Sequence, residues 1–147
     1  MLYLTTPRYL RSPFPDLPES LYKIEEVIFR TAREKNVILM GYVLMPTHIH
    51  LIAGSLEGGK GVSRFIHSIK GRIRETLQGK GKFWQDRFDD LLLKSEKQFR
   101  TKLNYIHYNP VRAGLVKKPE EWIFSSYRDW REGSSRRSIT LDFDWMR

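Results

Sequence analysis

The N-terminal part of the chain alternates between strand-like and helix-like patterns of apolar residues. Residues 2–6 predict a short strand, and residues 7–18 contain four prolines, which predicts an irregular connection. Asp16 and Glu19 have the spacing of a capping box and predict the start of a helix. Apolar residues then recur at helical spacing, and Asn36 is placed to end this helix.

The middle of the chain begins with two apolar segments, residues 37–45 and 48–53, which a Pro-Thr pair separates. Their length and β-rich composition predict two neighbouring strands in a hairpin. A loop at residues 54–61 follows. Apolar residues three and four positions apart across residues 62–77 then predict an amphipathic helix, which a glycine-containing segment ends.

The next segments predict a further strand and two helices. Residues 83–94 predict a strand with an aromatic start. Ser95 and Gln98 form a second candidate capping box, which opens a helix. That helix should finish at Asn109, because a proline follows and the residue before a proline disfavours helical backbone. Residues 119–130 predict a short helix with packing aromatics.

The resulting order, β-α-β-β-α-β-α, fits an α+β fold, a ferredoxin-like antiparallel sheet with two helices on one face. The additional C-terminal helix carries Tyr105. No linker is strong enough to divide the chain, so we expect one domain over residues 1–133 and a C-terminal tail over residues 134–147. The tail is rich in Ser and Arg and ends in aromatic residues. It is either loose or docked through those aromatics.

The composition adds a strong positive charge to this picture. The 147 residues include 26 Lys and Arg against 17 Asp and Glu, a net charge of +9, which favours a polyanionic partner. The chain has no cysteine, which excludes disulfides and thiolate metal sites. No apolar run approaches the roughly 20 residues of a membrane span, and no signal segment is evident. We therefore expect a cytoplasmic protein with no membrane partner.

Two of the four histidines, His48 and His50, stand one residue apart in an apolar strand segment. Residues two apart on a strand point to the same side, so both imidazoles should share one face. This is half of a divalent-metal site; imidazole suits Zn, Mn, Ni, Co and Cu, whereas Mg prefers oxygen. The alternative is two hydrogen-bonded or surface histidines. The apolar surroundings weigh against it, because burying an unpaired imidazole is costly.

Tyr105 and Asn109 supply the remaining chemistry. At 3.6 residues per turn, Tyr105 lies about 200° from the core position Leu103, so it should leave the core face. Asn109 follows four residues later and should lie near Tyr105, where its amide oxygen can complete a His-His-Asn ligand set. Tyr108 is the alternative nucleophile and His107 the alternative ligand, although His107 points about 200° away from Tyr105.

These residue types suit the cleavage of a phosphodiester. A bound cation neutralises charge on the non-bridging oxygens and fixes the line of attack. The phenol must lose its proton, and a nearby cation or a water relay can assist this loss. A phosphotyrosine ester keeps the energy of the broken bond, so the freed 3′-hydroxyl can reverse the step without ATP. In a basic protein, this combination predicts the cutting and joining of a nucleic-acid strand.

Basic and aromatic residues near these segments are candidate DNA contacts. The helix over residues 62–77 carries a basic face, which either follows backbone phosphates or is simply solvated. Tyr108 and Trp84 can stack a base, although core packing is the expected role of Trp84. The candidate DNA-binding residues are Arg64, Lys70, Arg72, Arg74, Arg87, Tyr108 and Arg112.

Five short motifs follow one another at characteristic spacing: residues 41–51 (GYVLMPTHIHL), 65–71 (FIHSIKG), 83–88 (FWQDRF), 105–115 (YIHYNPVRAGL) and 121–130 (EWIFSSYRDW). Together they resemble the single-tyrosine HUH transposases, which are named for a His–hydrophobic–His motif. The likeness is strongest to the REP-associated tyrosine transposases, which act on single-stranded DNA hairpins. It runs from about residue 37 to residue 130, most of the chain.

By this resemblance, His48, His50 and Asn109 fall on the metal ligands. Tyr105 falls on the nucleophile that becomes joined to a DNA 5′-phosphate. The resemblance also implies Mg²⁺ or Mn²⁺ as the metal. It departs at Thr47, where the family commonly has Asn, and we expect this change to affect ligand orientation rather than ligation. Related transposases include dimers, so a homodimer with the tyrosine acting on the partner's metal site is one expected assembly.

The predicted function is a metal-dependent single-stranded DNA endonuclease and strand transferase acting at hairpins. The main alternative is a domesticated protein that binds hairpins without cutting, which would not need the histidine, tyrosine and asparagine set. A replication initiator or relaxase is disfavoured by a short chain with one candidate tyrosine and no attached helicase. A phosphoesterase acting on RNA ends would need a second His-x-Thr or His-x-Ser motif, which the sequence lacks.

Overall fold

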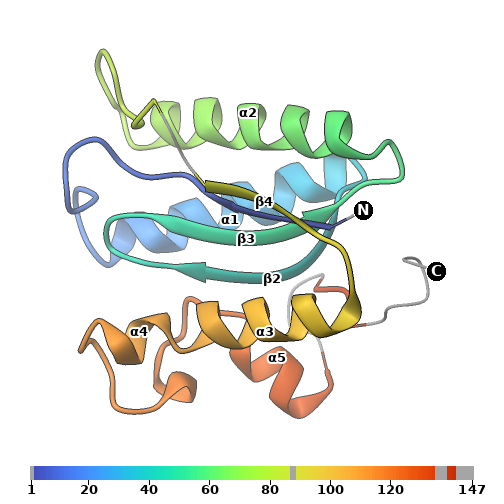
Figure 1. Ribbon diagram of the computed structural model, residues 1–147. Coiled ribbons are helices and arrows are strands. Elements are labelled where there is room, and N and C mark those ends of the chain that lie inside the picture. Colours follow the sequence, from blue (N-terminus) through green and yellow to red (C-terminus); the bar gives the residue numbers. More distant parts are fainter. Residues whose placement is uncertain (1, 87–88, 135–138, 142–147) are drawn as a thin grey trace.

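The computed structural model describes residues 2–86, 89–134 and 139–141, and it has the expected α+β architecture (Figure 1). No helix in these ranges is long and apolar enough to cross a membrane. The elements are β1 Leu2–Thr6, α1 Glu19–Glu34, β2 Ile38–Leu44, β3 Ile49–Gly54, α2 Gly59–Thr76, β4 Asp89–Leu93, α3 Glu96–His107, α4 Asn109–Arg112, the short 3-10 helix η1 Pro119–Glu121 and α5 Tyr127–Glu132.

The four strands form one antiparallel sheet in the order β2-β3-β1-β4. β1 lies inside the sheet, with Thr5 opposite Leu51 on β3 and opposite Asp90 on β4. β2 and β3 form the predicted hairpin, with Val43 opposite His50. This is the ferredoxin-like arrangement that the element order predicted.

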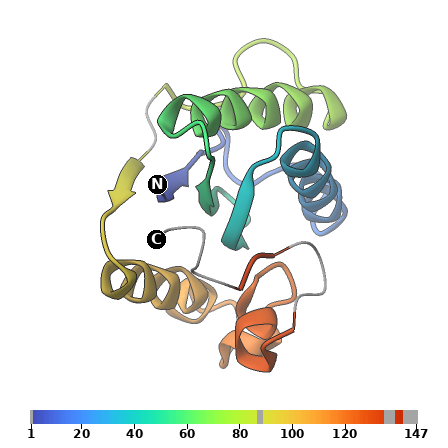
Figure 2. The ribbon, with the colours of Figure 1, turned by 90° about the vertical axis from the view of Figure 1, so that its right-hand side faces the viewer.

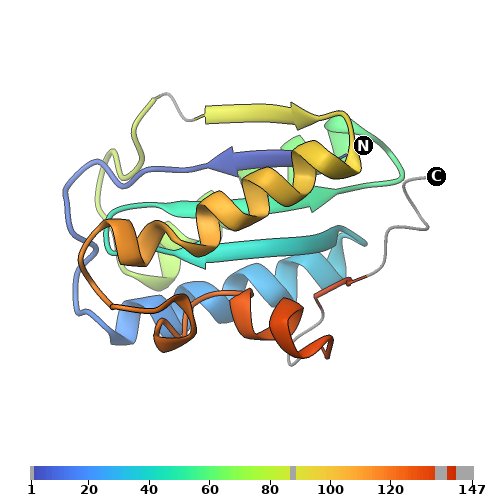
Figure 3. The same ribbon diagram turned by 60° about the horizontal axis from the view of Figure 1, so that its bottom comes forward.

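Helices cover both faces of the sheet (Figure 2). α1 and α2 enclose the larger hydrophobic core, which includes Leu51 and Phe65. α3 and α5 lie on the opposite face, where α3 crosses the strands diagonally and Phe99 packs in a second core (Figure 3). Gly41 on β2 allows this close approach, because a Cβ there would lie 2.6 Å from Leu103 Cδ1.

The two ends of α1 differ in how well the sequence predicted them. Asn36 adopts φ +54° just beyond the helix, which suits a residue that ends a helix. The predicted capping box is wrong, because Pro18 occupies the N-cap position and no side chain caps the helix. Asp16 instead has φ +52°, and its carbonyl accepts a hydrogen bond from the Ser20 N–H.

The strand predicted over residues 83–94 is too long, because within its described residues, 83–86 and 89–94, the strand β4 covers Asp89–Leu93. Phe83 and Trp84 are buried in the larger core instead. Phe83 packs against the Tyr9 ring, and Trp84 forms a single backbone bridge to Tyr9. Large aromatic residues are common in strands, but a buried connection also needs them, and composition alone does not separate the two.

α3 begins as predicted, but the chain stays helical beyond Asn109. The Ser95 hydroxyl accepts a hydrogen bond of 3.0 Å from the Gln98 N–H, which is the predicted cap. Tyr108 separates α3 from α4, and Pro110 lies in the first turn of α4, where its missing N–H costs nothing. Asn109 therefore opens a second helical turn rather than ending the first.

The C-terminal segment is not the single helix predicted over residues 119–130. It forms η1, an irregular stretch and α5, which Gly133 ends with φ +67°. In the predicted tail, Ile139 is buried and forms a parallel bridge to Leu39 at the edge of β2. The tail therefore docks in part through an aliphatic residue. Its aromatic residues, at positions 143 and 145, lie outside the described residues.

Candidate metal and tyrosine site

Two imidazoles meet at one end of β3. His48 immediately precedes the strand, and its backbone forms an isolated antiparallel β-bridge with Arg8. His50 is the second residue of the strand. Their Nε2 atoms lie 3.1 Å apart, and the two rings are nearly perpendicular with centroids 4.8 Å apart. Ile49 and Leu51, on either side of His50, belong to the core under α1 and α2. His50 therefore points to the α3 side of the sheet.

Two threonine hydroxyls hold the other nitrogen of each ring. Thr6 Oγ1 lies 3.1 Å from His50 Nδ1, and Thr47 Oγ1 lies 2.7 Å from His48 Nδ1. Each ring is anchored at Nδ1 and turns Nε2 toward the other ring. Sequence reasoning noticed Thr47 only as a departure from a family pattern. It missed Thr6, because the register that places β1 beside β3 is not visible in the sequence.

Asn109 brings a third group to the same point. Its Nδ2 atom lies 3.0 Å from His50 Nε2. Turning the amide by 180° puts Oδ1 in that place, because the two halves of the amide have the same shape and hydrogen bonding selects between them. Asn109 reaches the pair because α4 lies beside the turn that joins β2 and β3 (Figures 1 and 3).

The spacing of these groups fits a divalent cation. Neighbouring ligands of an octahedral ion, each about 2.1 Å from it, lie about 3 Å from one another. The separations of 3.1 Å between the two imidazoles and 3.0 Å between His50 and Asn109 match this value. No group of three His, Cys, Asp or Glu side chains in the described parts of the chain is placed to hold a metal. An amide is thus the third protein donor that this site offers.

Burial keeps both imidazoles neutral. Desolvation, followed by the charge of Arg8, lowers the pKa of His48 to about 4. His50 is only 6% exposed, and its burial, followed by the charge of His48, lowers its pKa to about 3. Neutral imidazole is the form that binds a metal. The pair can therefore accept a cation at neutral pH without first losing protons.

Tyr105 lies in the last turn of α3 and is 51% exposed. The Arg112 guanidinium lies over its ring, 4.1 Å from the centroid, and donates a hydrogen bond to its backbone carbonyl. Lys102 Nζ lies 5.8 Å from the same centroid. The phenol is outside the hydrophobic interior, beside two cations, and one helical turn before Asn109.

The alternative nucleophile and the alternative ligand differ in exposure. His107 is buried, with Nε2 at 2.8 Å from Ser126 Oγ and its ring against Tyr127. Burial lowers the pKa of His107 to about 3, so it serves as a neutral packing residue between α3 and the C-terminal segment. Tyr108 is 38% exposed and keeps access to solvent, with its ring edge-on to Tyr127.

Two residues of the predicted basic face contribute to the fold. Arg72 joins α2 to α1, because its Nη1 lies 2.6 Å from Glu34 Oε2 and 2.9 Å from Thr31 Oγ1. Arg64 pairs with Glu57 just ahead of α2. Ion pairs between exposed side chains are weak. A phosphate can therefore compete for either guanidinium, but neither is held ready for one.

The other candidate DNA contacts fall on both sides of the sheet. Lys70 and Arg74 line a cavity between α2 and the sheet. Arg112 and Tyr108 lie near the tyrosine on the opposite side. Arg87 lies outside the described residues. The structure thus divides the predicted contacts between two surfaces, which the sequence alone did not show.

The fold and the side-chain cluster define an α+β protein with a ferredoxin-like sheet that presents a His-His-Asn group beside an exposed tyrosine. The chain belongs to the family of REP-associated tyrosine transposases. It is 30% identical over 111 residues to the REP-associated tyrosine transposase of Escherichia coli (strain K12), a match that covers 75% of this chain and 67% of the relative. A Haemophilus influenzae relative is 28% identical over 97 residues, a match that covers 57% of this chain and 55% of the relative. No protein-family model matches the chain.

Solved structures agree with the fold. The structure of a REP-associated tyrosine transposase bound to a REP hairpin superposes with a TM-score of 0.78 at 24% identity, over 96% of this chain and 86% of that one. A structure from Deinococcus radiodurans R1 superposes with a TM-score of 0.53 at 15% identity, over 72% of this chain and 88% of that one. These likenesses confirm the predicted fold class.

Proposed function

We propose that this protein is a metal-dependent single-stranded DNA endonuclease and strand transferase that acts at hairpins through a 5′-phosphotyrosine intermediate. The observation that carries the proposal is that the two imidazoles lie 3.1 Å apart and the Asn109 amide lies 3.0 Å from one of them, with the exposed Tyr105 one helical turn away. The net charge of +9 supports DNA as the partner. The REP hairpin held by the solved relative suggests the form of that DNA.

His48 and His50 would hold the cation through Nε2, and Asn109 would hold it through Oδ1. We propose Mn²⁺ or Mg²⁺; Mn²⁺ matches imidazole better, whereas Mg²⁺ would depend on oxygen ligands from phosphate and water. When bound, the cation neutralises charge on the non-bridging phosphate oxygens. The threonine hydroxyls at Nδ1 keep both rings aimed at one point, so the protein does not have to order them when the ion arrives.

Tyr105 supplies the nucleophile. In the cleavage step, a bond forms between Tyr105 Oη and phosphorus, and the bond between phosphorus and the 3′-oxygen breaks. The phenol loses its proton to water, and the leaving 3′-oxygen takes up a proton. In the joining step, a 3′-hydroxyl attacks the phosphotyrosine and releases the phenol, so the diester is restored without another energy source. Arg112 keeps positive charge beside the ring that carries the ester.

The decisive experiment follows a labelled hairpin with single-stranded flanks on a denaturing gel in Mn²⁺. The unchanged chain should cut the strand and form a covalent adduct. Tyr105→Phe should bind the hairpin normally and form no adduct, whereas the control Tyr108→Phe should still form it. An adduct in Tyr105→Phe would remove this tyrosine from the reaction. Hairpin binding without cleavage by the unchanged chain, in Mn²⁺ and in Mg²⁺, would favour the non-cleaving binder.

The metal is tested with His48→Ala. This variant should lose cleavage in Mn²⁺, while its affinity for the hairpin in EDTA should equal that of the unchanged chain. Glu26→Ala, on the exposed side of α1, is the control and should keep both properties. Cleavage by the unchanged chain in EDTA would exclude the metal from the mechanism.

A homodimer is tested by mixing two inactive variants. If Tyr105 acts on the metal site of a partner, then Tyr105→Phe and His48→Ala proteins should together restore adduct formation, although neither forms it alone. If the tyrosine serves its own histidines, the mixture should stay inactive. The mass of the complex with DNA, measured by light scattering, gives the number of chains independently.

A further inference from the structure

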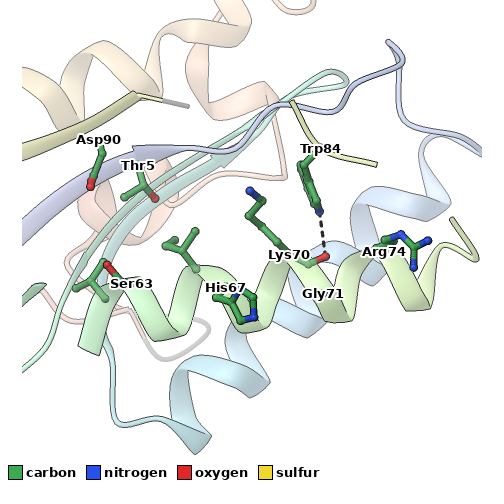
Figure 4. Close-up of a pocket in the computed structure, with 10 residues that line it drawn as sticks. Thr5, Ser63, His67, Lys70, Gly71, Arg74, Trp84 and Asp90 are labelled. Atoms are coloured by element: carbon green, nitrogen blue, oxygen red, sulfur yellow. Dashed lines mark hydrogen bonds between the residues drawn. The ribbon is translucent and has the colours of Figure 1, made fainter. Parts of the chain in front are cut away.

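A channel runs between α2 and the β4 edge of the sheet, on the face opposite to the histidine pair. It consists of two neighbouring cavities of about 400 Å³ and 560 Å³, which share Val62, Ser63 and Asp90 as walls. α2 packs against α1 and β3, and both cavities reach Asp90 on β4. Figure 4 shows the first cavity, with Thr5 and Asp90 on the strand side and α2 along the other.

Basic side chains follow the whole length of this channel. Lys60 and Arg64 border the second cavity, Lys70 and Arg74 border the first, and His67 lies between them. A helix rises about 21 Å over the 14 steps from residue 60 to residue 74, so the basic side chains extend along the channel rather than gathering at one point. The lysines and arginines of this set all come from α2, on one side of the channel, where Arg64 also pairs with Glu57.

The opposite side and the floor have a different character. Tyr3 lines the second cavity, and Trp84 lines the first, where its indole donates a hydrogen bond of 3.0 Å to the Lys70 carbonyl. Thr5 is buried, and its Oγ1 has no hydrogen-bond partner among the described residues. Asp90 stands opposite Thr5 on β4, and partial burial raises the pKa of its carboxyl group. A buried hydroxyl without a partner is uncommon and indicates a group that is still to be satisfied.

We propose that this channel binds unpaired nucleotides of a DNA strand, with bases in the cavities and phosphates along the α2 cations. An apolar slot with a few polar groups suits a base, because a carboxylate accepts from an exocyclic amino group and a hydroxyl can donate or accept. Asp90 would repel phosphate, but it lies on the strand side, away from the helix that carries the cations. This separation of charges orients a nucleotide with its phosphate toward α2.

The strand in the channel must be single. A base enters a cavity only when it is unpaired, because paired bases are stacked inside the duplex. The inference rests on the proposed function and deepens it, since it assigns DNA a second contact surface on the face away from the cleavage site. The flank of a hairpin, rather than its stem, is the segment that fits.

The test measures binding by fluorescence anisotropy in EDTA, with the full chain and two probes. One probe is a hairpin with a single-stranded extension, on the 5′ or the 3′ side, and the other is the same hairpin without extensions. Ser63→Trp places a bulky side chain in the wall that both cavities share, so it narrows both of them. We expect this variant to bind the extended hairpin about tenfold more weakly and the blunt hairpin unchanged.

A second variant tests the channel independently, in case Ser63→Trp does not fold. The double variant Lys70→Gln/Arg74→Gln should weaken binding of the extended hairpin and lower its salt slope by about two. The matched control is Lys23→Gln/Arg30→Gln, which removes two exposed cations from α1, and it should change neither value.

The outcomes separate this inference from the proposed function. The channel assignment is overturned if Ser63→Trp and Lys70→Gln/Arg74→Gln bind the extended hairpin as the unchanged chain does, or if they weaken both probes equally. Adduct formation by the unchanged chain would still support the proposed function in that case. If the unchanged chain binds neither probe and cuts neither, the proposed function itself fails.

Discussion

The two faces of the sheet bury different kinds of side chain. Both faces pack an apolar core, but the α1–α2 face also buries the carboxylate of Glu25 and several hydroxyls, whereas the α3 face gathers the hydroxyl of Thr6 and the imidazole of His50 at one end. Alternate residues of β3 serve the two faces, so the same strand builds a core and a site. A site on a sheet gains rigid side-chain positions, but each buried polar group then needs a partner. The hydroxyl of Thr6, the imidazole of His48 and the amide of Asn109 are partners of His50.

Adjacent residues on β3 give the largest expected contrast. Leu51→Ala should lower the free energy of unfolding by about 2–5 kcal/mol, because it leaves a cavity in the larger core. His50→Ala should abolish Mn²⁺ binding and cleavage at a smaller cost in stability. Urea unfolding and calorimetric metal titration of both variants measure the contrast. Comparable losses of stability in the two variants would show that His50 is chiefly a packing residue.

Adjacent residues on β1 sharpen the comparison further. Thr6→Val should weaken Mn²⁺ binding about 10–100-fold, because His50 loses the group that fixes its ring. Thr6→Ser should restore most of this affinity. Thr5→Val is the matched control, since Thr5 faces α2, and it should leave metal binding unchanged. An equal effect of Thr5→Val and Thr6→Val would refute the positioning role of Thr6.

The pH dependence of stability follows from the buried imidazoles. The pKa is about 4 for His48 and about 3 for His50 and for His107 in the folded chain, below the ordinary 6.5. The unfolded chain therefore binds protons first as the pH falls. Their contribution to the free energy of unfolding is complete above about pH 6.5 and is lost toward pH 3–4, with a slope of up to about 1.4 kcal/mol per pH unit for each imidazole.

Urea unfolding at a series of pH values checks this expectation. His50→Gln should flatten the dependence between pH 6.5 and 4, and His67→Gln, on the exposed side of α2, should not. A pH dependence that is the same in both variants would assign the effect to other groups.

The cap of α3 carries the smallest expected effect. Ser95→Ala should cost about 1 kcal/mol of unfolding free energy, because the Gln98 N–H loses its acceptor, and Ser95→Gly should cost less than Ser95→Ala. Thermal unfolding measures both variants. Metal affinity should be unchanged, since the cap lies at the far end of α3 from Asn109. A fall in metal affinity would show that the N-terminal turn sets the position of the amide.

The sequence predicted what local geometry determines. Hydrophobic periodicity placed the four strands and the main helices, and it failed where burial is not periodic, as at Phe83 and Trp84. Because residues two apart on a strand share a face, the sequence predicted that His48 and His50 lie together. Because residues four apart on a helix are neighbours, it predicted that Asn109 lies near Tyr105. The meeting of these two pairs depends on how α3 docks on the sheet, which spacing does not determine; the ligand chemistry of the residues and the family resemblance suggested it. The Thr6 contact and the channel beside α2 depend on strand register and helix packing, which no local pattern records.

The three proposed donors come from separate layers, because the imidazoles belong to the sheet and the amide to the helical segment laid across it. A cation held by all three would link these layers, and the melting temperature of the protein would rise with the concentration of the cation. Lifting that segment would withdraw Asn109 and Tyr105 together. Cation binding and attack on the strand would then be lost together, so both steps of the proposed reaction depend on the docking of one segment.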